Sequence, residues 1–229
     1  MIRLSPIDQI LFGLMNATLL FTLAYSVLGM SLQYEAGFGA EDGPVEYGTA
    51  ICLFLSCLIL MSQAIRTARF SGASSLWLVL YSAAFLFGAG EEISWGQRII
   101  GWETTGFFAE HNVQNETTLH NLAFGDEQLT KSLFGSYLTV AILLYLVVLP
   151  LLYSRVSLVA RLVDRIMLPL PSARHGITAV GASLVIGLLA TVSRKWEAYE
   201  FIFSLLTMSI FLHPANAHRF TKRNPDTKT

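Results

Sequence analysis

The sequence has few charged residues, few cysteines and none of the motifs that identify common soluble enzymes. Only 14% of its 229 residues are Asp, Glu, Lys or Arg, whereas soluble domains carry about 25%. Fifteen basic and sixteen acidic residues give a net charge of −1, so the chain has no basic field to attract nucleic acid. Its two cysteines, Cys52 and Cys57, form neither a CxxC pair nor a zinc framework. These absences exclude an ordinary cytosolic enzyme, a disordered protein and a nucleic-acid-binding protein.

Motifs for two common kinds of catalysis are also missing. The sequence contains no Walker loop, no nucleophile elbow, no haem motif and no HExxH motif. ATP hydrolysis and serine-hydrolase chemistry are therefore disfavoured.

Long apolar segments are what the sequence has in abundance. Hydrophobic residues make up 53% of the chain, and the mean hydropathy is +0.54. A membrane-spanning helix needs about 20 mainly apolar residues, and six segments reach or approach that length: 10–30, 45–64, 76–95, 133–153, 176–192 and 196–213. We predict an all-α fold, namely a polytopic membrane helix bundle with six transmembrane helices.

The distribution of basic residues predicts the orientation of this bundle. Cytoplasmic loops are enriched in Lys and Arg, and placing both termini in the cytoplasm puts eleven of the fifteen basic residues there. The acidic residues divide the opposite way, with thirteen of the sixteen on the outer side. We therefore expect both the N-terminus and the C-terminus to be cytoplasmic.

The expected organisation is a single transmembrane domain over residues 1–218, followed by a polar cytoplasmic tail over 219–229. An extracytoplasmic polar loop is predicted at 96–132. In the cytoplasmic segment 154–167, Leu158, Leu162 and Ile166 recur every four residues while arginines take another face. This pattern indicates a short helix lying in the membrane interface, although a rigid connector explains the segment equally well.

Carboxylates near the outer end of the sixth span indicate function, because ionisable residues inside a membrane are costly. The apolar run 201–212 covers roughly 18 Å of a hydrocarbon core of about 30 Å. Crossing the membrane would therefore draw Glu200 and Glu197 into it, and the two share a helix face. If the helix instead continues past His213, both glutamates rise to the interface.

The third span also ends in charged residues, within the string Gly90-Glu91-Glu92-Ile93-Ser94-Trp95-Gly96-Gln97-Arg98. On one continuous helix, a single stripe would contain Glu91, Ser94, Trp95 and Arg98, and Glu92 would point elsewhere. We expect Arg98 to pair with a carboxylate and keep it ionised.

The outer loop concentrates polar side chains between residues 111 and 121. On a helix, Glu116 and His120 would be one turn apart, with Asn112 on the same face. Glu and His at this spacing can share a metal ion or form an ion pair, so Glu116, His120 and His111 are the predicted metal ligands. That this loop meets the third and sixth spans in the plane of the membrane is a hypothesis based on their common depth.

The strings from Gly90 to Arg98 and from Asn112 to Asn121 carry a resemblance. Together they resemble a signature of uncharacterised bacterial polytopic membrane proteins, Glu-Glu-x-Ser-Trp-Gly-Gln-Arg followed by Asn-x-Gln-x-Glu-x-x-Leu-His-Asn. The resemblance covers a small part of the chain. It implies a multi-pass protein of the plasma membrane (the bacterial inner membrane) and brings no activity with it.

The first function that fits these features is a membrane-embedded enzyme acting on a lipid or lipid-linked substrate. It would use either a divalent metal that activates water or general acid–base catalysis. Its predicted catalytic residues are Glu91, Glu92, Glu197, Glu200 and His120. Its predicted substrate-binding residues are Arg98, Trp95, Gln97, Asn112 and Gln114, with Arg98 holding an anionic group such as a lipid phosphate.

Two alternatives remain. In a structural or assembly subunit of a membrane complex, the same charges would only hold the helices and the loop together. In an ion-coupled transporter, the carboxylates would bind protons or cations. The expected partners are membrane lipids and either other membrane proteins or a second copy of the chain, and no nucleic acid.

Overall fold

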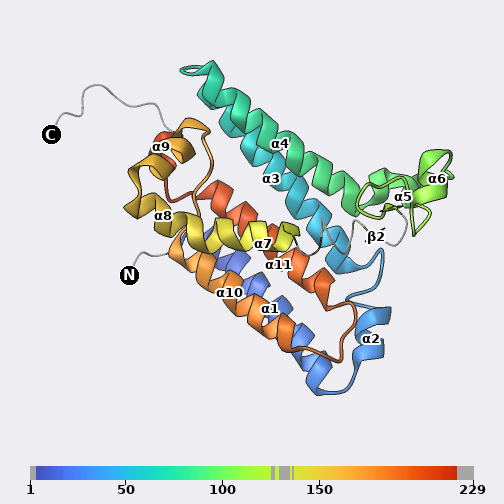
Figure 1. The fold of residues 1–229 in the computed structure, drawn as a ribbon. Coiled ribbons are helices and arrows are strands. Elements are labelled where there is room, and N and C mark those ends of the chain that lie inside the picture. Colours follow the sequence, from blue (N-terminus) through green and yellow to red (C-terminus); the bar gives the residue numbers. More distant parts are fainter. Residues whose placement is uncertain (1–3, 125–126, 129–134, 136, 221–229) are drawn as a thin grey trace.

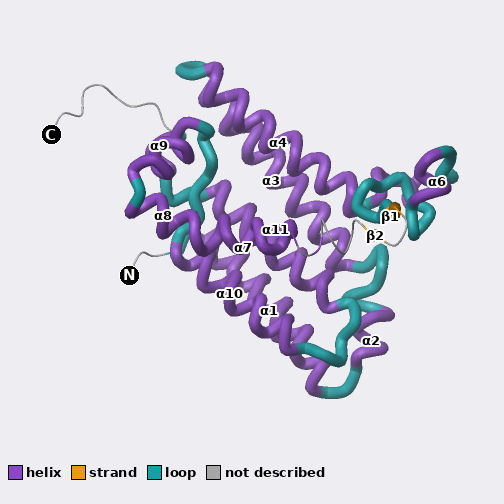
Figure 2. Tube along the Cα trace, viewed as in Figure 1, coloured by secondary structure: helices purple, strands orange, loops and turns teal. Residues whose placement is uncertain are grey.

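The computed structural model describes residues 4–124, 127–128, 135 and 137–220, and these residues are mostly helical (Figures 1 and 2). The first half of the chain contains α1 (Pro6–Val27), α2 (Ser31–Ala36), α3 (Pro44–Ala68), α4 (Gly72–Glu92), η1 (Ser94–Gly96), α5 (Gln97–Ile100) and α6 (Phe107–His111). A short antiparallel hairpin follows, formed by β1 (Ala123–Phe124) and β2 (Glu127–Gln128). The second half contains α7 (Leu138–Leu143), η3 (Leu144–Val148), α8 (Leu149–Arg155), α9 (Ser157–Arg165), α10 (Ala173–Leu188), α11 (Lys195–Leu212) and η4 (Ala217–Arg219).

Four helices are long and apolar enough to cross a membrane, which confirms the predicted helical membrane fold in its coarse form. They are α1, α3, α4 and the stretch Leu138–Arg155 that α7, η3 and α8 form together. These helices coincide with the first four predicted spans, although residues 133–134 of the fourth lie outside the described part of the chain. The segments predicted as spans five and six form α10, which has 16 residues, and α11, which has 18 residues including Lys195, Glu197 and Glu200.

Helix α11 is the centre of the packing. It packs against α3, α1 and α10, and in Figure 1 it runs between them. The consecutive residues Ile202, Phe203, Ser204 and Leu205 are each at most 8% exposed, and consecutive residues point to different sides of a helix. A helix that is apolar all round is one that is buried.

The starts of several helices follow from capping side chains. Pro6 begins α1 and the Ser5 hydroxyl accepts a hydrogen bond from the Asp8 N–H at 3.0 Å, a pairing of N-cap and first-turn proline that suits a helix start. Ser71 caps α4 in the same way. Helix α10 begins with a capping box between Ser172 and His175.

The fourth helical stretch contains a π-helical turn, η3, immediately before Pro150. Proline has no N–H to donate and its ring crowds the carbonyl four residues earlier, which here belongs to Leu146. A π turn accommodates such a disruption. Helix α10 approaches closely at this point, because a Cβ on Gly176 would lie 2.9 Å from the Leu146 carbonyl oxygen. Glycine at 176 therefore permits this contact.

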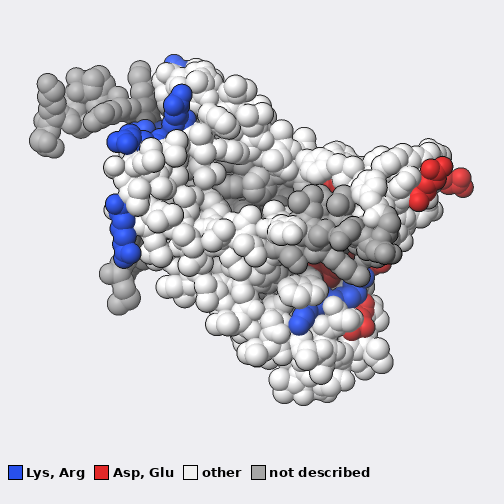
Figure 3. Space-filling model, viewed as in Figure 1, with Lys and Arg blue, Asp and Glu red and all other residues white. Residues whose placement is uncertain are grey.

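Charged side chains are unevenly distributed, and at the end away from α8 and α9 basic side chains lie beside acidic ones. Lys and Arg gather over the end formed by α8 and α9, and Asp and Glu are prominent near α6 (Figure 3). Helix α9 falls within segment 154–167, where the sequence predicts a short amphipathic helix. Residues 221–229 of the predicted tail lie outside the described residues.

Candidate functional site

The chain reverses direction directly after α4. Helix α4 ends at Glu92, and three consecutive residues then have positive φ angles: Ser94 (48°), Trp95 (54°) and Gly96 (79°). A right-handed helix cannot continue through such residues. The predicted helical stripe from Glu91 to Arg98 is therefore wrong, because Arg98 belongs to the separate short helix α5.

Trp95 is held at this turn by the end of α4. Its indole N–H donates to Glu91 Oε1 at 2.8 Å, and its ring lies so close to Gly90 that a Cβ there would be 2.7 Å from a ring carbon. Left-handed backbone at a residue other than glycine persists only where the surroundings fix it. Gly90 leaves room for the indole ring and Glu91 accepts its hydrogen bond, so both hold Trp95 in this conformation. Trp95 therefore stabilises the turn.

Glu91 is the anchor of the loop that follows. The residue is 6% exposed, and its Oε2 accepts the backbone N–H groups of Leu119 at 2.7 Å and His120 at 3.0 Å. The same oxygen lies 3.2 Å from His120 Nδ1. Because a carboxylate only accepts, Nδ1 carries the proton and Nε2 is the basic nitrogen of the neutral ring.

Carboxylates near the ends of three helices lie close enough for their charges to interact, and we call them the Glu92 cluster: Glu46, Glu91, Glu92, Glu197 and Glu200. The charge of Glu92 interacts with those of the other four, and Glu200 with Glu197 and Glu46. Helices α3, α4 and α11 thus contribute to one site at the end where α3 begins and α4 ends. The sequence pointed to every member except Glu46.

Members of the Glu92 cluster differ in how their charges are compensated. Glu197 pairs with Arg194 at 2.9 Å, and Glu46 pairs with Arg98 at 3.1 Å. Among the described residues, Glu92 and Glu200 have neither a hydrogen bond nor an ion pair. Electrostatic repulsion within the cluster is therefore relieved for some carboxylates and not for these two.

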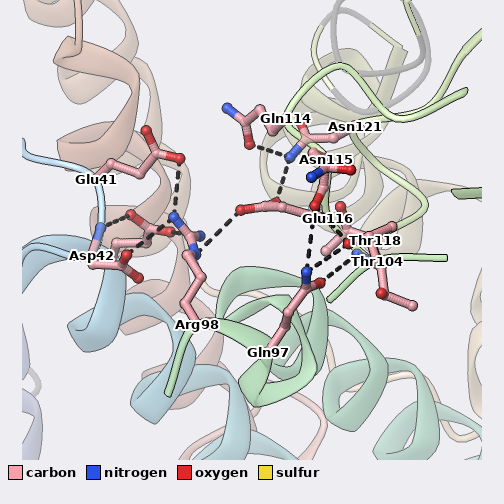
Figure 4. Close-up of polar contacts among 12 residues, drawn as sticks. Glu41, Asp42, Gln97, Arg98, Thr104, Gln114, Asn115, Glu116, Thr118 and Asn121 are labelled. Carbon is pink, nitrogen blue, oxygen red and sulfur yellow. Dashed lines mark hydrogen bonds and ion pairs between the residues drawn. The ribbon is translucent and has the colours of Figure 1, made fainter. Parts of the chain in front are cut away.

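Arg98 joins the loop to the start of α3, as Figure 4 shows. Its guanidinium lies 3.0 Å from Glu41, 3.3 Å from Asp42, 3.1 Å from Glu46 and 3.2 Å from Glu116. Burial alone would lower the pKa of Arg98, but the four carboxylates outweigh it and raise that pKa above its ordinary value. The prediction that Arg98 pairs with a carboxylate is confirmed. Glu91, at the end of α4, is not among its partners.

The loop from Asn112 to Asn121 is not a helix, and the prediction that Glu116 and His120 share a helix face is wrong. The Asn112 side chain accepts the N–H groups of Gln114 and Glu116, each at 3.0 Å, and donates to the Thr118 carbonyl at 2.9 Å. An asparagine that bonds its own downstream backbone in this way favours turns over helix. Glu116 consequently faces Arg98, and His120 faces Glu91.

Two more predicted substrate-binding residues support the same loop (Figure 4). Gln97 donates to the Thr104 hydroxyl at 2.6 Å and accepts the Thr117 N–H at 2.7 Å. Gln114 accepts from the Asn121 amide, which also donates to Glu116 at 3.0 Å. These amides satisfy the polar groups of a loop without regular structure, as burial requires.

The three predicted metal ligands are not brought together. Glu116 lies with Arg98, His120 lies with Glu91, and the His111 ring contacts the Phe107 carbonyl at 2.9 Å and stacks on the Phe107 ring. Within the described ranges, no group of three or more His, Cys, Asp or Glu side chains is arranged to hold a metal ion.

A second polar cluster, which the sequence analysis missed, lies at the other end of α11. In this Asp8 cluster, Asp8 accepts from the Ser209 hydroxyl at 2.6 Å and pairs with Arg174 at 3.0 Å and His213 at 3.2 Å. His175 Nε2 lies 3.0 Å from the Ser209 hydroxyl. No periodicity singles out Asp8, because its partners come from the distant helix α10 and from α11 and the residue that follows it.

The direction of the hydrogen bonds shows what the Asp8 cluster can do. His175 Nδ1 accepts the Ser172 N–H at 3.0 Å, so the imidazole proton is on Nε2 and is donated to Ser209. Ser209 in turn donates to Asp8. A serine nucleophile needs the histidine to accept its proton, so this chain of bonds is structural.

The chain matches no protein-family model, no curated protein and no solved structure. Its function is therefore argued from the site, as fold alone does not determine function.

Proposed function

We propose that the chain crosses the membrane six times with both termini in the cytoplasm, as a protein of the bacterial inner membrane. The helices α10 and α11 supply the fifth and sixth spans, and their 16 and 18 residues correspond to about 24 and 27 Å. A core of about 30 Å then includes Glu197 and Glu200. The segregation of basic and acidic residues between the two ends supports this orientation.

The function that we propose is that of a membrane-embedded acid–base enzyme, with its site at the Glu92 cluster. One observation carries the proposal: Glu92 and Glu200 are compensated by no described side chain, and they share the cluster with Glu91, which orients His120. Carboxylates kept without partners in a membrane protein are costly for stability. Neighbouring carboxylates with different surroundings are typical of acid–base sites.

Each residue has a distinct role in this mechanism. His120 acts as general base at Nε2, and Glu91 is a positioning residue that fixes the imidazole tautomer. One carboxyl group of the pair Glu92 and Glu200 donates a proton to the leaving group, and the proton that His120 takes up then restores that carboxyl group. Arg98, Trp95, Gln97, Asn112 and Gln114 maintain the loop that carries His120.

The substrate class that fits this position is a lipid or a lipid-linked molecule. The cluster lies where α3 begins and α4 ends, at the boundary between the apolar spans and the polar loop. A lipid headgroup occupies the same depth in a bilayer. A substrate could therefore reach the site from the membrane without leaving its leaflet.

The test is lipid conversion by the purified protein in vesicles made from a bacterial membrane-lipid extract, followed by mass spectrometry. We expect the wild type to convert at least one lipid or lipid-linked species. Glu92→Gln, Glu200→Gln and His120→Gln should each lower the rate by about 100-fold or more, the usual contribution of acid–base groups. Glu110→Gln, an exposed carboxylate on α6, is the matched control and should keep the wild-type rate.

Two outcomes would overturn the enzyme proposal. One is a well-folded wild type that converts no species, and the other is conversion that the three variants leave unchanged. A structural or assembly subunit is the second candidate, because Arg98 connects the loop to α3 through four carboxylates. That function predicts no conversion and a marked drop in unfolding temperature for Arg98→Gln.

A further inference from the structure

An apolar groove of about 410 Å³ runs along the side of the bundle between α1 and α3, with α11 as its floor. Its size is within the range of small-molecule and cofactor sites. The side chains that define it come from three helices: Ile7, Leu55, Leu58, Arg66, Met208 and Leu212.

The groove has the length of one leaflet. Leu55 and Arg66 mark its extent along α3, and eleven residues of helix correspond to about 16 Å. The hydrocarbon core is about 30 Å thick, so the groove extends from the end of α3 to about the middle of the bilayer. Ile7, Leu55 and Leu58 are 48%, 38% and 47% exposed, and they present an apolar surface along this length.

Arg66 supplies a positive charge at one end of the groove. It lies in the last turn of α3, which ends at Ala68, and its side chain is exposed. Its Nε donates to the Ser62 carbonyl at 3.3 Å. Arg98, Arg174 and Arg194 are each paired with a carboxylate, whereas Arg66, like Arg69, forms no ion pair with any described residue.

We propose that this groove binds one acyl chain of an anionic phospholipid, whose phosphate pairs with Arg66. The apolar walls match the chain and the unpaired guanidinium matches the headgroup in charge and geometry. The groove opens near the end of α3, far along the helix from Glu46 and the Glu92 cluster. The bound lipid is therefore distinct from the substrate of the proposed reaction.

A second groove provides an internal comparison. It measures about 340 Å³ and lies between α10 and the stretch formed by α7 and η3, and all of its lining residues are uncharged, among them Val140, Leu144 and Leu184. Acyl chains can fill such a groove, but nothing in its lining selects an anionic headgroup. Of these two grooves, only the first should therefore contribute a preference for anionic lipid.

The experiment is native mass spectrometry of the full-length protein released from vesicles of equal parts dioleoylphosphatidylglycerol and dioleoylphosphatidylcholine. The wild type should retain one phosphatidylglycerol in preference to phosphatidylcholine. Arg66→Gln should lower this preference about fivefold, the effect of one basic residue at an anionic surface. Arg69→Gln removes a charge at the same helix end outside the groove and should lower it less than twofold.

A second pair of variants tests the apolar part. Leu58→Trp should fill the groove and abolish retention of the lipid, whereas Leu184→Trp in the second groove should leave the retained phosphatidylglycerol in place. Equal retention of both lipids by the wild type would overturn the proposal, as would Arg66→Gln behaving like Arg69→Gln. A dimer that Leu58→Trp dissociates would also overturn it, because the groove would then hold a second copy of the chain.

Discussion

The carboxylates at the two ends of α11 differ in how far neighbouring groups compensate their charges. Near its C-terminal end, Asp8 is 1% exposed and is matched by Ser209, Arg174 and His213. Near its N-terminal end, the half-buried Glu92 and the exposed Glu200 lie with three further carboxylates and have no ion pair among the described residues. Full compensation of a buried charge serves stability, whereas the incomplete compensation of these two carboxylates is what we propose to serve function.

Removal of the charge of Asp8 should produce the largest change. Asp8→Asn leaves Arg174 without its carboxylate and disrupts the bonds from Ser209 and His213. We expect the free energy of unfolding to fall by about 3–5 kcal/mol, as when one partner of a buried pair is lost. Equilibrium unfolding in mild detergent measures this change.

Asp164→Asn is the matched control for Asp8→Asn. Asp164 contacts Tyr153 and the half-exposed Arg219, and partly exposed pairs contribute about 0–1 kcal/mol. Equal losses in the two variants would show that the Asp8 cluster is not the stabilising element we infer.

Glu91→Gln tests the member of the Glu92 cluster whose two carboxylate oxygens both accept hydrogen bonds. The amide replaces one accepting oxygen with a donor and so opposes the N–H groups of Leu119 and His120. We expect the protein to lose about 1–3 kcal/mol of stability, the penalty for unsatisfied buried donors. Hydrogen exchange of the Leu119 and His120 amides should accelerate, and unchanged exchange would contradict the anchoring role.

The neighbouring substitution Glu92→Gln should change the free energy of unfolding in the opposite direction. It removes a charge that repels Glu200 and Glu197 and that has no partner among the described residues. The variant should be at least as stable as the wild type and gain up to about 1 kcal/mol, while losing lipid conversion. A marked loss of stability would place Glu92 with Glu91 among the structural residues.

The smallest effect is expected at Glu35 in α2. Its carboxylate accepts hydrogen bonds but is not fully buried. The Ser193 hydroxyl at 2.6 Å and backbone N–H at 3.1 Å donate to its carboxylate and lower the pKa of Glu35. A lowered pKa stabilises the fold at neutral pH, and this contribution is lost as the pH falls through that pKa. Glu35→Gln should therefore unfold at a slightly lower temperature at pH 7, with the difference shrinking below about pH 4. A difference independent of pH would contradict this account.

The helices could be predicted from the sequence because spanning segments need long apolar runs, and such runs are visible without any tertiary information. The turn at Ser94 and Trp95 could not, because it depends on the contact of the indole with Gly90 and Glu91. The spacing of Glu91, Ser94, Trp95 and Arg98 by itself predicts that the helix continues to Arg98.

The partners of the charged residues were the least predictable part of the site. Depth along each span placed Glu91, Glu92, Glu197 and Glu200 at a common level. Which residues then meet depends on helix neighbours, and this is why Glu46 and the four partners of Arg98 were not identified. The spacing of Glu116 and His120 fits a helix, but the asparagine side chains of the loop favour turns, and spacing alone does not show which of the two prevails.

The central place of α11 has a consequence for biogenesis. This helix is translated after α1, α3 and α10, yet it fills the space between them and brings Ser209 and His213 to Asp8. The helices made earlier must therefore wait for their common packing surface, and Asp8 must wait for two of its three partners. Packing of these helices is consequently a step that follows their synthesis and requires α11.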